Sequence, residues 1–312
     1  MKTALIFPGQ GSQYIGMGQD FYLKYKEARE VYEELDELLK NNLSKQIFEG
    51  NEQSLALTQN SQPSIMATSF AIYLALKSEG LIDSNSFHCV AGHSLGEYSA
   101  LVVNNCLAFQ DSVKLLKVRS KAMQESMPSG TGGMVALIGC NEEVIDTVIT
   151  EALNYGKIYI ANDNAAGQIV LSGEICAIEF ILSNSKKLNI KRSIKLPVSA
   201  PFHCELIQNA RDIMSKEIPC YKFNTFSVPL YSNVTAKICD ETEIEKLLIE
   251  QIISKVRWRE SMENMINDGY KNFIEIGPGN VLTNLVKRTS KDVTAISISK
   301  LEDLEKLANI KL

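Results

Sequence analysis

The sequence predicts an α/β protein with a mostly parallel sheet and a small inserted subdomain. Three observations carry this prediction. A short apolar run at residues 4–7 opens the chain and enters a glycine-rich loop, and a second apolar run at 89–91 is followed at once by a turn and a helix-compatible segment. Between residues 127 and 198 the order of short strands and helices changes. Strands that alternate with helices are typical of a parallel sheet covered by helices.

The first third of the chain begins with a strand at residues 4–7. The loop after it, Pro8-Gly9-Gln10-Gly11-Ser12-Gln13, lacks the G-K-[ST] of a phosphate-binding P-loop. Apolar residues recur with helical spacing over about 21–40, which predicts an amphipathic helix. A second helix is expected to open at Pro63 and to end near Gly80, because Pro favours helix starts and Gly the position past the end. A further helix is expected at 111–125.

A break at Pro128-Ser129-Gly130-Thr131-Gly132-Gly133 separates this region from the next. Beyond it the sequence predicts strands at 134–138, 158–161, 168–171 and 193–196, and helices at 142–153 and 175–188. This β-α-β-β-α-β order is typical of a ferredoxin-like fold. We therefore predict a small subdomain at 127–198 and a main α/β core made of residues 1–126 and 199–312.

The rest of the chain returns to the main core. It is expected to contain helices near 205–216, 243–253 and 261–268, and strands near 228–232 and 273–276. The last strand enters the turn Gly277-Pro278-Gly279.

Composition excludes several classes of protein. The chain has 312 residues, of which 45% are hydrophobic and 22% charged, which is ordinary for a globular protein with a large core. A net charge of −5 argues against nucleic-acid binding, which needs a basic surface. No apolar run approaches the roughly 18 residues of a membrane span. We expect neither nucleic acid nor membrane as a partner.

The cysteines and the start of the chain indicate a cytoplasmic protein. The seven cysteines are odd in number, scattered and never spaced as C-x-x-C, so they predict neither a disulfide framework nor a zinc site. The opening segment reaches Pro8-Gly9 too early for the apolar core of a signal peptide.

The pentapeptide Gly92-His93-Ser94-Leu95-Gly96 is the most informative motif. It lies between an apolar strand and a helix, which is the setting of a G-x-S-x-G nucleophile elbow. The glycines allow the sharp turn that lifts a serine hydroxyl above the sheet, and a plain tight turn is the alternative. Ser94 is thus the candidate nucleophile.

A serine nucleophile needs a base, and the chain has only three histidines. His93 adjoins the serine, so its side chain is expected to leave on the opposite side. His88 lies at the start of the same strand, roughly 20 Å from the elbow at ~3.3 Å per residue. His203 remains, at the seam where the subdomain rejoins the core, and such seams form binding clefts. A hydrogen-bonded core histidine is the alternative.

Two further features fit acyl transfer. Arg119 falls on the apolar face of the helix at 111–125, so it must pair with an internal carboxylate or lie at a cavity wall, where its planar fork could bind a substrate carboxylate. The loop Gly9-Gln10-Gly11 offers backbone N–H groups near the elbow. One of them, with the N–H of Leu95, would form an oxyanion hole.

Together these motifs resemble one family closely, the malonyl-CoA:acyl carrier protein transacylases, which are acyltransferases of fatty-acid synthesis. The resemblance covers nearly the whole chain, and the ordered set is specific where each motif alone is not. The motifs are Phe7-Pro8-Gly9-Gln10-Gly11-Ser12-Gln13, Gln62-Pro63, Gly92-His93-Ser94-Leu95-Gly96-Glu97-Tyr98, Arg119-Ser120-Lys121-Ala122-Met123, Asn162-Asp163-Asn164, Val198-Ser199-Ala200-Pro201-Phe202-His203, Ser232-Asn233-Val234, Gln251, Val256-Arg257-Trp258 and Glu275-Ile276-Gly277-Pro278-Gly279.

The resemblance implies a hydrolase-like α/β core with an inserted ferredoxin-like subdomain. It implies that Ser94 is the nucleophile and that His203 is the general base and acid. Gln251 lies where the family places the group that orients the histidine, and its backbone carbonyl is the expected contact.

The resemblance also assigns the substrate site. The backbone amides of Gln10 and Leu95 would form the oxyanion hole, and Arg119 would bind the free carboxylate of a malonyl group. The ring of Phe202 would crowd an α-methyl group. The other implied substrate-binding positions are Gln62, Met123, Asn162 and Asn164.

The implied reaction is a ping-pong transfer of malonyl from malonyl-CoA to the phosphopantetheine thiol of holo-acyl carrier protein, through a malonyl-serine ester. No metal or cofactor is expected, and we expect a monomer. The carrier is expected to be acidic, so a local basic patch would dock it, with a solvated charged face as the alternative. The proposed patch consists of Lys186, Lys187, Lys191, Arg192 and Lys195.

Three other functions remain open. A serine thioesterase would pass the acyl group to water, but a typical hydrolase places an acid between serine and histidine, and Asp146 and Asp163 fall in the inserted subdomain. A free-standing acyltransferase of polyketide synthesis would use the same residues. A carrier-binding protein without activity would have to keep Ser94, His203 and Arg119 unused.

Overall fold

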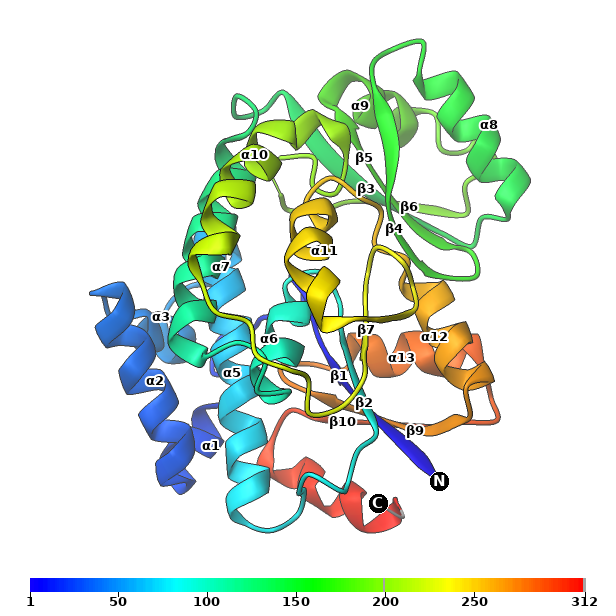
Figure 1. Ribbon diagram of the computed structural model, residues 1–312. Coiled ribbons are helices and arrows are strands. Elements are labelled where there is room, and N and C mark those ends of the chain that lie inside the picture. Colours follow the sequence, from blue (N-terminus) through cyan, green and yellow to red (C-terminus); the bar gives the residue numbers. More distant parts are fainter. Residues whose placement is uncertain (199, 311–312) are drawn as a thin grey trace.

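The computed structural model describes residues 1–198 and 200–310. The predicted start of the second core segment, residue 199, and its last residues, 311 and 312, lie outside the described residues. The described chain has a mixed α/β fold with two sheets, and the smaller one lies above the larger one in Figure 1.

The larger sheet has six strands in the order β10-β9-β1-β2-β7-β8. All neighbouring pairs are parallel except β7 and β8, which confirms the predicted mostly parallel sheet. The strands are β1 (Lys2–Phe7), β2 (Cys89–Gly92), β7 (Leu230–Tyr231), β8 (Ile238–Cys239), β9 (Tyr270–Ile276) and β10 (Thr294–Ile298).

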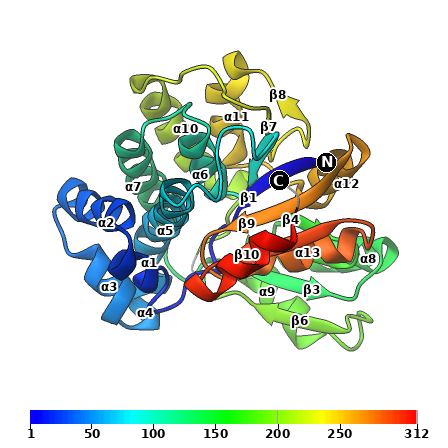
Figure 2. The ribbon, with the colours of Figure 1, turned by 90° about the horizontal axis from the view of Figure 1, so that it is seen from below.

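Both faces of this sheet are buried, because successive side chains of a strand point to opposite faces. In β1, Leu5 and Phe7 belong to one hydrophobic cluster, and Ala4 and Ile6 belong to another. Helices α12 (Trp258–Asn267) and α13 (Val281–Thr289) pack on the face of Ala4 and Ile6 (Figure 2). The helices that contribute to the other cluster are α1 (Gln19–Lys24), α2 (Lys26–Leu39), α3 (Leu43–Glu49), α4 (Glu52–Ala56), α5 (Thr58–Ser78), α6 (Gly96–Val103), α7 (Phe109–Glu125), α10 (Gln208–Glu217) and α11 (Ile244–Gln251).

The smaller sheet is antiparallel, in the order β4-β5-β3-β6. Its elements follow the predicted succession along the chain. In β3, Val135 and Leu137 join a cluster with two helices, whereas Met134 joins the core of the larger sheet. The elements are β3 (Gly132–Ile138), α8 (Glu142–Ala152), β4 (Ile158–Ala165), β5 (Gln168–Glu174), α9 (Ile175–Ser183) and β6 (Arg192–Lys195).

Several predicted helices have other bounds. The helix expected at 21–40 is broken at Tyr25, whose backbone is extended, and periodicity hid the break because Phe21 and Tyr25 both enter the same core. The helix expected to open at Pro63 begins five residues earlier, at Thr58, so this Pro lies inside α5. The helix expected at 175–188 ends at Ser183.

Other elements were not predicted at all. Helices α3, α4 and α13 and strands β8 and β10 were missed, as were the 3₁₀ helices Ile218–Cys220, Glu241–Glu243 and Leu301–Asn309. The predicted helix at 205–216 begins as a 3₁₀ turn, Glu205–Ile207. No helix of the described chain is long and apolar enough to cross a membrane.

Candidate active site

Ser94 lies in the turn between β2 and α6, with a positive φ of 54°. The flanking glycines are required by close packing. A Cβ at Gly92 would lie 1.9 Å from the carbonyl group of Gly96, and a Cβ at Gly96 would lie 2.2 Å from the carbonyl oxygen of Phe7. Only glycine fits at either position, so the turn presents Ser94 at the carboxyl end of the parallel strands, where ligands bind in open α/β sheets.

Asn233 holds this turn from a distant part of the chain. Its Oδ1 accepts a hydrogen bond from the backbone N–H of Ser94 at 2.7 Å, and its Nδ2 donates to the carbonyl of Gly92 at 2.6 Å. Asn233 is 2% exposed. A buried amide therefore satisfies two backbone groups of a strained turn, and sequence reasoning gave it no such role.

His203 bonds to Ser94. Its Nε2 accepts from Ser94 Oγ at 2.8 Å, and its Nδ1 donates to the backbone carbonyl of Gln251 at 2.9 Å. This carbonyl fixes the tautomer in which Nε2 is the acceptor. Burial and the charge of Arg119 lower the pKa of His203 to about 3, so the ring is neutral at physiological pH.

The other two histidines do not bond to Ser94. His93 was expected to point away from the serine. Its ring lies 5.5 Å from that of Trp258 and its Nε2 donates to Asn164 Oδ1 at 2.8 Å, although the residue also lines the cavity of Ser94. At the far end of strand β2, His88 Nδ1 accepts from the N–H of Thr3 at 3.2 Å.

Arg119 is fully buried beside the serine. Its Nη1 donates to Gln62 Oε1 at 2.8 Å, and its Nη2 donates to Gln251 Oε1 at 2.8 Å and to Ser94 Oγ at 3.1 Å. Its guanidinium also lies 5.6 Å from the centre of the Tyr98 ring. No carboxylate of the described residues forms a salt bridge with it. A buried cation without a counter-ion can bind an anionic ligand group.

Glu97, the residue after the elbow, is a second buried charged group that sequence reasoning left without a role. It is 1% exposed, and one of its carboxyl oxygens accepts a hydrogen bond from Gln251 Nε2. Burial raises its pKa to about 8. Every residue of helix α6 is buried, so an acidic residue inside this apolar stretch was the available signal.

A cavity of about 80 Å³ brings the predicted residues together. Ser94 and His203 line it with the predicted Gln10, Gln62, Met123, Asn162 and Phe202, and with the unpredicted His93, Met134, Leu196 and Val198. An adjoining cavity of about 200 Å³ shares Gln10 and Asn162 with it and is also lined by Asn164.

The two candidate oxyanion donors lie at the same site. Gln10 lines the cavity, and Leu95 directly follows Ser94 at the start of α6. Within the part of the chain that the structure describes, neither backbone N–H donates to a protein acceptor. Both amides are thus available to a ligand oxygen.

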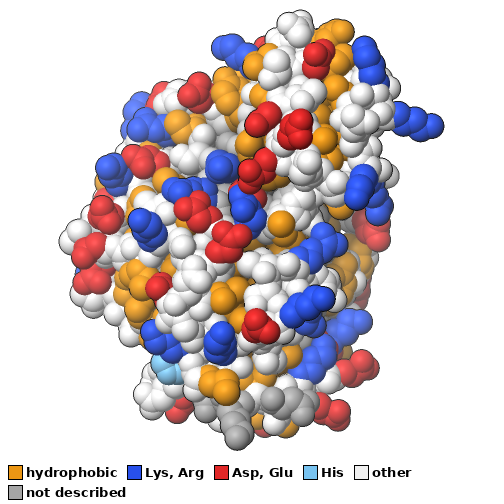
Figure 3. Space-filling view, turned by 90° about the vertical axis from the view of Figure 1, so that its right-hand side faces the viewer, with side chains coloured by type: hydrophobic (Ala, Val, Ile, Leu, Met, Phe, Trp, Pro, Cys, Tyr) orange, Lys and Arg blue, Asp and Glu red, His pale blue; other side chains and the backbone are white. Residues whose placement is uncertain are grey.

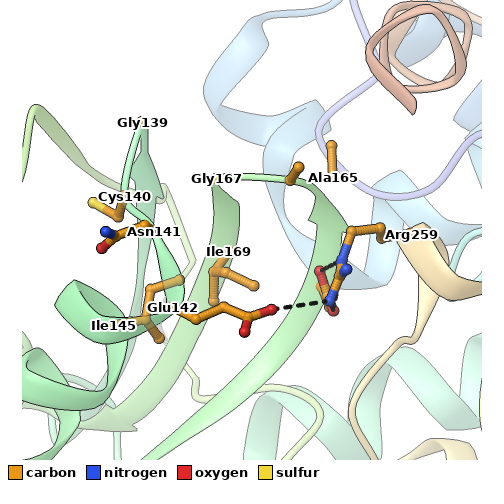
Figure 4. A pocket seen from close by; sticks show the side chains of 11 residues that line it. Gly139, Cys140, Asn141, Glu142, Ile145, Ala165, Gly167, Ile169 and Arg259 are labelled. Atoms are coloured by element: carbon orange, nitrogen blue, oxygen red, sulfur yellow. Dashed lines mark hydrogen bonds and ion pairs between the residues drawn. The ribbon is translucent and has the colours of Figure 1, made fainter. Parts of the chain in front are cut away.

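A larger cavity, of about 380 Å³, lies elsewhere, between the smaller sheet and α12 (Figure 4). Arg259 crosses it to pair with Asp163 at 2.9 Å and with Glu142 at 3.9 Å. None of the predicted site residues lines it. Asp163 is therefore engaged by an arginine and does not face His203.

The five predicted docking residues are all exposed on the smaller sheet and the turn before it. Lys186 and Lys187 follow the end of α9 in that turn, and Arg192 and Lys195 bound the edge strand β6. The face shown in Figure 3 carries basic side chains interspersed with acidic ones.

Comparisons with known proteins agree with one another. The acyl transferase domain family matches residues 4–305. The malonyl CoA-acyl carrier protein transacylase of Bacillus subtilis (strain 168) is 40% identical over 306 residues, which cover 97% of this chain and 95% of that protein. The crystal structure of acyl-carrier-protein-S-malonyltransferase from Bartonella henselae has a TM-score of 0.94 at 40% identity and covers 99% of each chain.

A solved complex gives a further comparison. It contains a type II PKS acyl-carrier protein with its malonyl-transacylase, has a TM-score of 0.94 at 34% identity, and covers 99% of this chain and 100% of that one. The sequence and the structural similarities both extend over almost the full length. The chain belongs to the family of malonyl-CoA:acyl carrier protein transacylases.

Proposed function

We propose that this protein transfers a malonyl group from malonyl-CoA to the phosphopantetheine thiol of acyl carrier protein, in fatty-acid synthesis. One observation carries the proposal. Ser94 Oγ lies within hydrogen-bond distance of both a neutral histidine, His203, and a buried arginine without a counter-ion, Arg119. The first contact activates a nucleophile, and the second provides a place for the free carboxylate of the acyl group.

The reaction has two halves. Ser94 Oγ attacks the thioester carbonyl while His203 Nε2 takes its proton, and the protonated histidine then gives the proton to the departing CoA thiolate. In the second half, the carrier's thiol gives its proton to His203 and attacks the malonyl-serine ester. The bond to Ser94 Oγ breaks, and the protonated histidine returns the proton to this oxygen. The backbone carbonyl of Gln251 stabilises the imidazolium that forms in each half.

The amides of Gln10 and Leu95 would bind the oxyanion of both tetrahedral intermediates. Losing one such donor typically lowers the rate ~10²–10³-fold. Arg119 would hold the malonyl carboxylate, so acetyl-CoA would leave the buried charge unpaired. The side chains around the acyl group would be Gln62, Met123, Asn162, Asn164 and Phe202.

We also propose the organisation that goes with this function. Residues 1–126 and 199–312 would form a hydrolase-like core, and residues 127–198 a ferredoxin-like subdomain, supported by its strand order β4-β5-β3-β6. The exposed basic residues Lys186, Lys187, Lys191, Arg192 and Lys195 would dock the acidic carrier. The protein would act as a cytoplasmic monomer without a metal or cofactor.

A carrier of polyketide synthesis is a second candidate acceptor, because the complex with a type II PKS carrier protein is similar over the full length. A thioesterase is disfavoured, since the partner of His203 Nδ1 is a carbonyl and Asp163 is engaged by Arg259. The two pathways share the same chemistry at Ser94.

Mass spectrometry of the intact protein after brief exposure to malonyl-CoA tests the proposal, with acetyl-CoA in parallel. We expect a malonyl ester that is absent in Ser94→Ala and that disappears on addition of holo-acyl carrier protein. We expect Arg119→Ala to lose the preference for malonyl over acetyl. An ester that is hydrolysed at the same rate without the carrier would contradict the proposed transfer to the carrier. The absence of any ester would contradict the mechanism with a serine nucleophile.

A further inference from the structure

Glu97 is a buried carboxyl group that no step of the proposed reaction uses. It lies on the first turn of α6, three residues after Ser94, and does not line the cavity. One oxygen accepts from Gln251 Nε2, and the other, Oε1, has no hydrogen-bond partner among the described residues. A buried carboxyl group with one unpaired oxygen costs stability, so its place beside Gln251 needs an explanation.

Its partner, Gln251, has a side-chain amide with four hydrogen-bonding positions, and three of them are occupied. Oε1 accepts from Arg119 Nη2 at 2.8 Å, while Nε2 donates to the backbone carbonyl of Ser94 at 3.1 Å and to Glu97. The reversed amide would place its N–H groups against the guanidinium, where only an acceptor fits. The two acceptors on the Nε2 side exclude that orientation.

We propose that Glu97 is a positioning residue for Arg119, acting through the amide of Gln251. The inference rests on the proposed function, because its consequence is selection of a dicarboxylic acyl group. Glu97 fixes the amide, the amide fixes the guanidinium fork, and the fork meets the ligand carboxylate.

The charge of Glu97 decides how strongly Arg119 attracts that carboxylate. Burial raises the pKa of Glu97 to about 8, so the group is mostly protonated at pH 7 and leaves Arg119 without an internal counter-ion. Above that pH, an ionised Glu97 would supply a negative charge one side chain away from the guanidinium. The bond between the ligand carboxylate and Arg119 would then contribute less to the binding of the malonyl group.

The other groups that face Glu97 do not titrate between pH 7 and 9. They are Arg119 of α7, the neighbouring Tyr98, whose pKa is raised to about 12, and Cys239 of β8, whose pKa is also raised by burial. The backbone N–H of Asn233 also faces it and carries no charge.

Two variants of Glu97 test the inference, with the rate of ester formation on Ser94 measured for malonyl-CoA and acetyl-CoA at pH 7 and 9. Glu97→Gln keeps the acceptor for Gln251 and cannot ionise. Glu97→Leu keeps the approximate volume and removes the acceptor. Circular dichroism and thermal unfolding establish whether each variant is folded.

For Glu97→Leu at pH 7 we expect kcat/KM for malonyl-CoA to fall about tenfold through KM, because the Arg119 guanidinium would lose one aligned hydrogen bond to the ligand carboxylate, with acetyl loading unchanged. For Glu97→Gln we expect near wild-type malonyl loading at pH 7. The ratio of malonyl to acetyl loading should fall from pH 7 to 9 in the wild type and stay constant in Glu97→Gln.

Equal ratios in the wild type and Glu97→Leu would overturn the inference, as would a wild-type ratio that falls with pH in parallel with that of Glu97→Gln. If Glu97→Leu does not fold, the pH comparison between the wild type and Glu97→Gln decides alone. A wild type that forms no malonyl ester would overturn the proposed function itself, which is a different result from an ester whose selectivity ignores Glu97.

Discussion

Replacing Asn233 by Ala should disturb the conformation of the turn at Ser94 without removing any of the proposed catalytic groups. Asn233 touches neither the cavity nor His203, yet it accepts from the N–H of Ser94 and donates to the carbonyl of Gly92. Ser94 has a φ of 54°, in a region that costs about 1–2 kcal/mol for an L-residue. Without the amide, the turn loses a contact that holds this conformation.

The size of the effect follows from the two bonds. The N–H of Ser94 is part-buried and has no other acceptor among the described residues, so leaving it unsatisfied costs about 1–3 kcal/mol. The bond to Gly92 adds about 1 kcal/mol. We expect Asn233→Ala to lower the free energy of unfolding by about 2–4 kcal/mol in total. A shift of Ser94 Oγ by about 1 Å would lower the rate of ester formation about 10²-fold.

Asn104→Ala is the matched control. Asn104 is also buried, and its side chain accepts from the N–H of Val228 and donates to the carbonyl of the same residue, each at 2.8 Å, at the other end of α6. Urea unfolding should show a similar loss of stability for both variants, whereas rapid-quench mass spectrometry should show slow ester formation only for Asn233→Ala. Wild-type loading by Asn233→Ala would refute the reasoning.

Three further predictions concern pH and packing. The pKa of His203 is lowered to about 3, so kcat/KM for ester formation should stay constant from pH 7 to 5. A histidine with an ordinary pKa near 6.5 would instead lower kcat/KM about 25-fold over this range, and such an acidic limb would contradict the prediction. Gly92→Ala should lose about 3 kcal/mol of stability, because its Cβ would overlap the carbonyl of Gly96. Gly133→Ala should lose little, because its Cβ would have ordinary contacts at 3.4 Å. Equal thermal midpoints for the two variants would show that the turn tolerates a side chain at Gly92. The pKa of Glu97 is raised, so stability that is present below its unfolded-state pKa of about 4.5 is lost as pH rises towards 8, by at most about 1.4 kcal/mol per pH unit. In thermal unfolding, Glu97→Gln should therefore become more stable relative to the wild type from pH 5 to 8. A constant difference between the two would show that Glu97 is ionised throughout.

The features of the fold that could be predicted are those encoded locally. Short apolar runs predicted strands β1 and β2, and the glycines on either side of Ser94 predicted a sharp turn, because each feature depends only on neighbouring residues. The break at Tyr25 could not be predicted, because the flanking residues bury the same face whether or not the helix is continuous. The start of α5 was misplaced because Pro63 is tolerated in a helix whose burial outweighs one lost hydrogen bond.

Two contacts of the site were predicted, those of His203 with Ser94 and with the backbone carbonyl of Gln251, but its other contacts were not. Elimination among three histidines brought His203 to Ser94, and the resemblance brought in Gln251. The bonds of Asn233 to the elbow span about 140 positions, and no local pattern reports such a contact. Glu97 was read only as part of a motif, since its role depends on a side chain that lies 154 residues away.

The contacts of Arg119 link recognition of the acyl group to the strength of the base. Its Nη2 donates to Ser94 Oγ, and its charge lowers the pKa of His203. A malonyl carboxylate bound to Arg119 would compete for that N–H and compensate that charge, so Ser94 Oγ would regain a lone pair and His203 would hold a proton more firmly. An acetyl group would do neither. The same guanidinium would therefore favour malonyl twice, once in binding and once in the attack on the thioester.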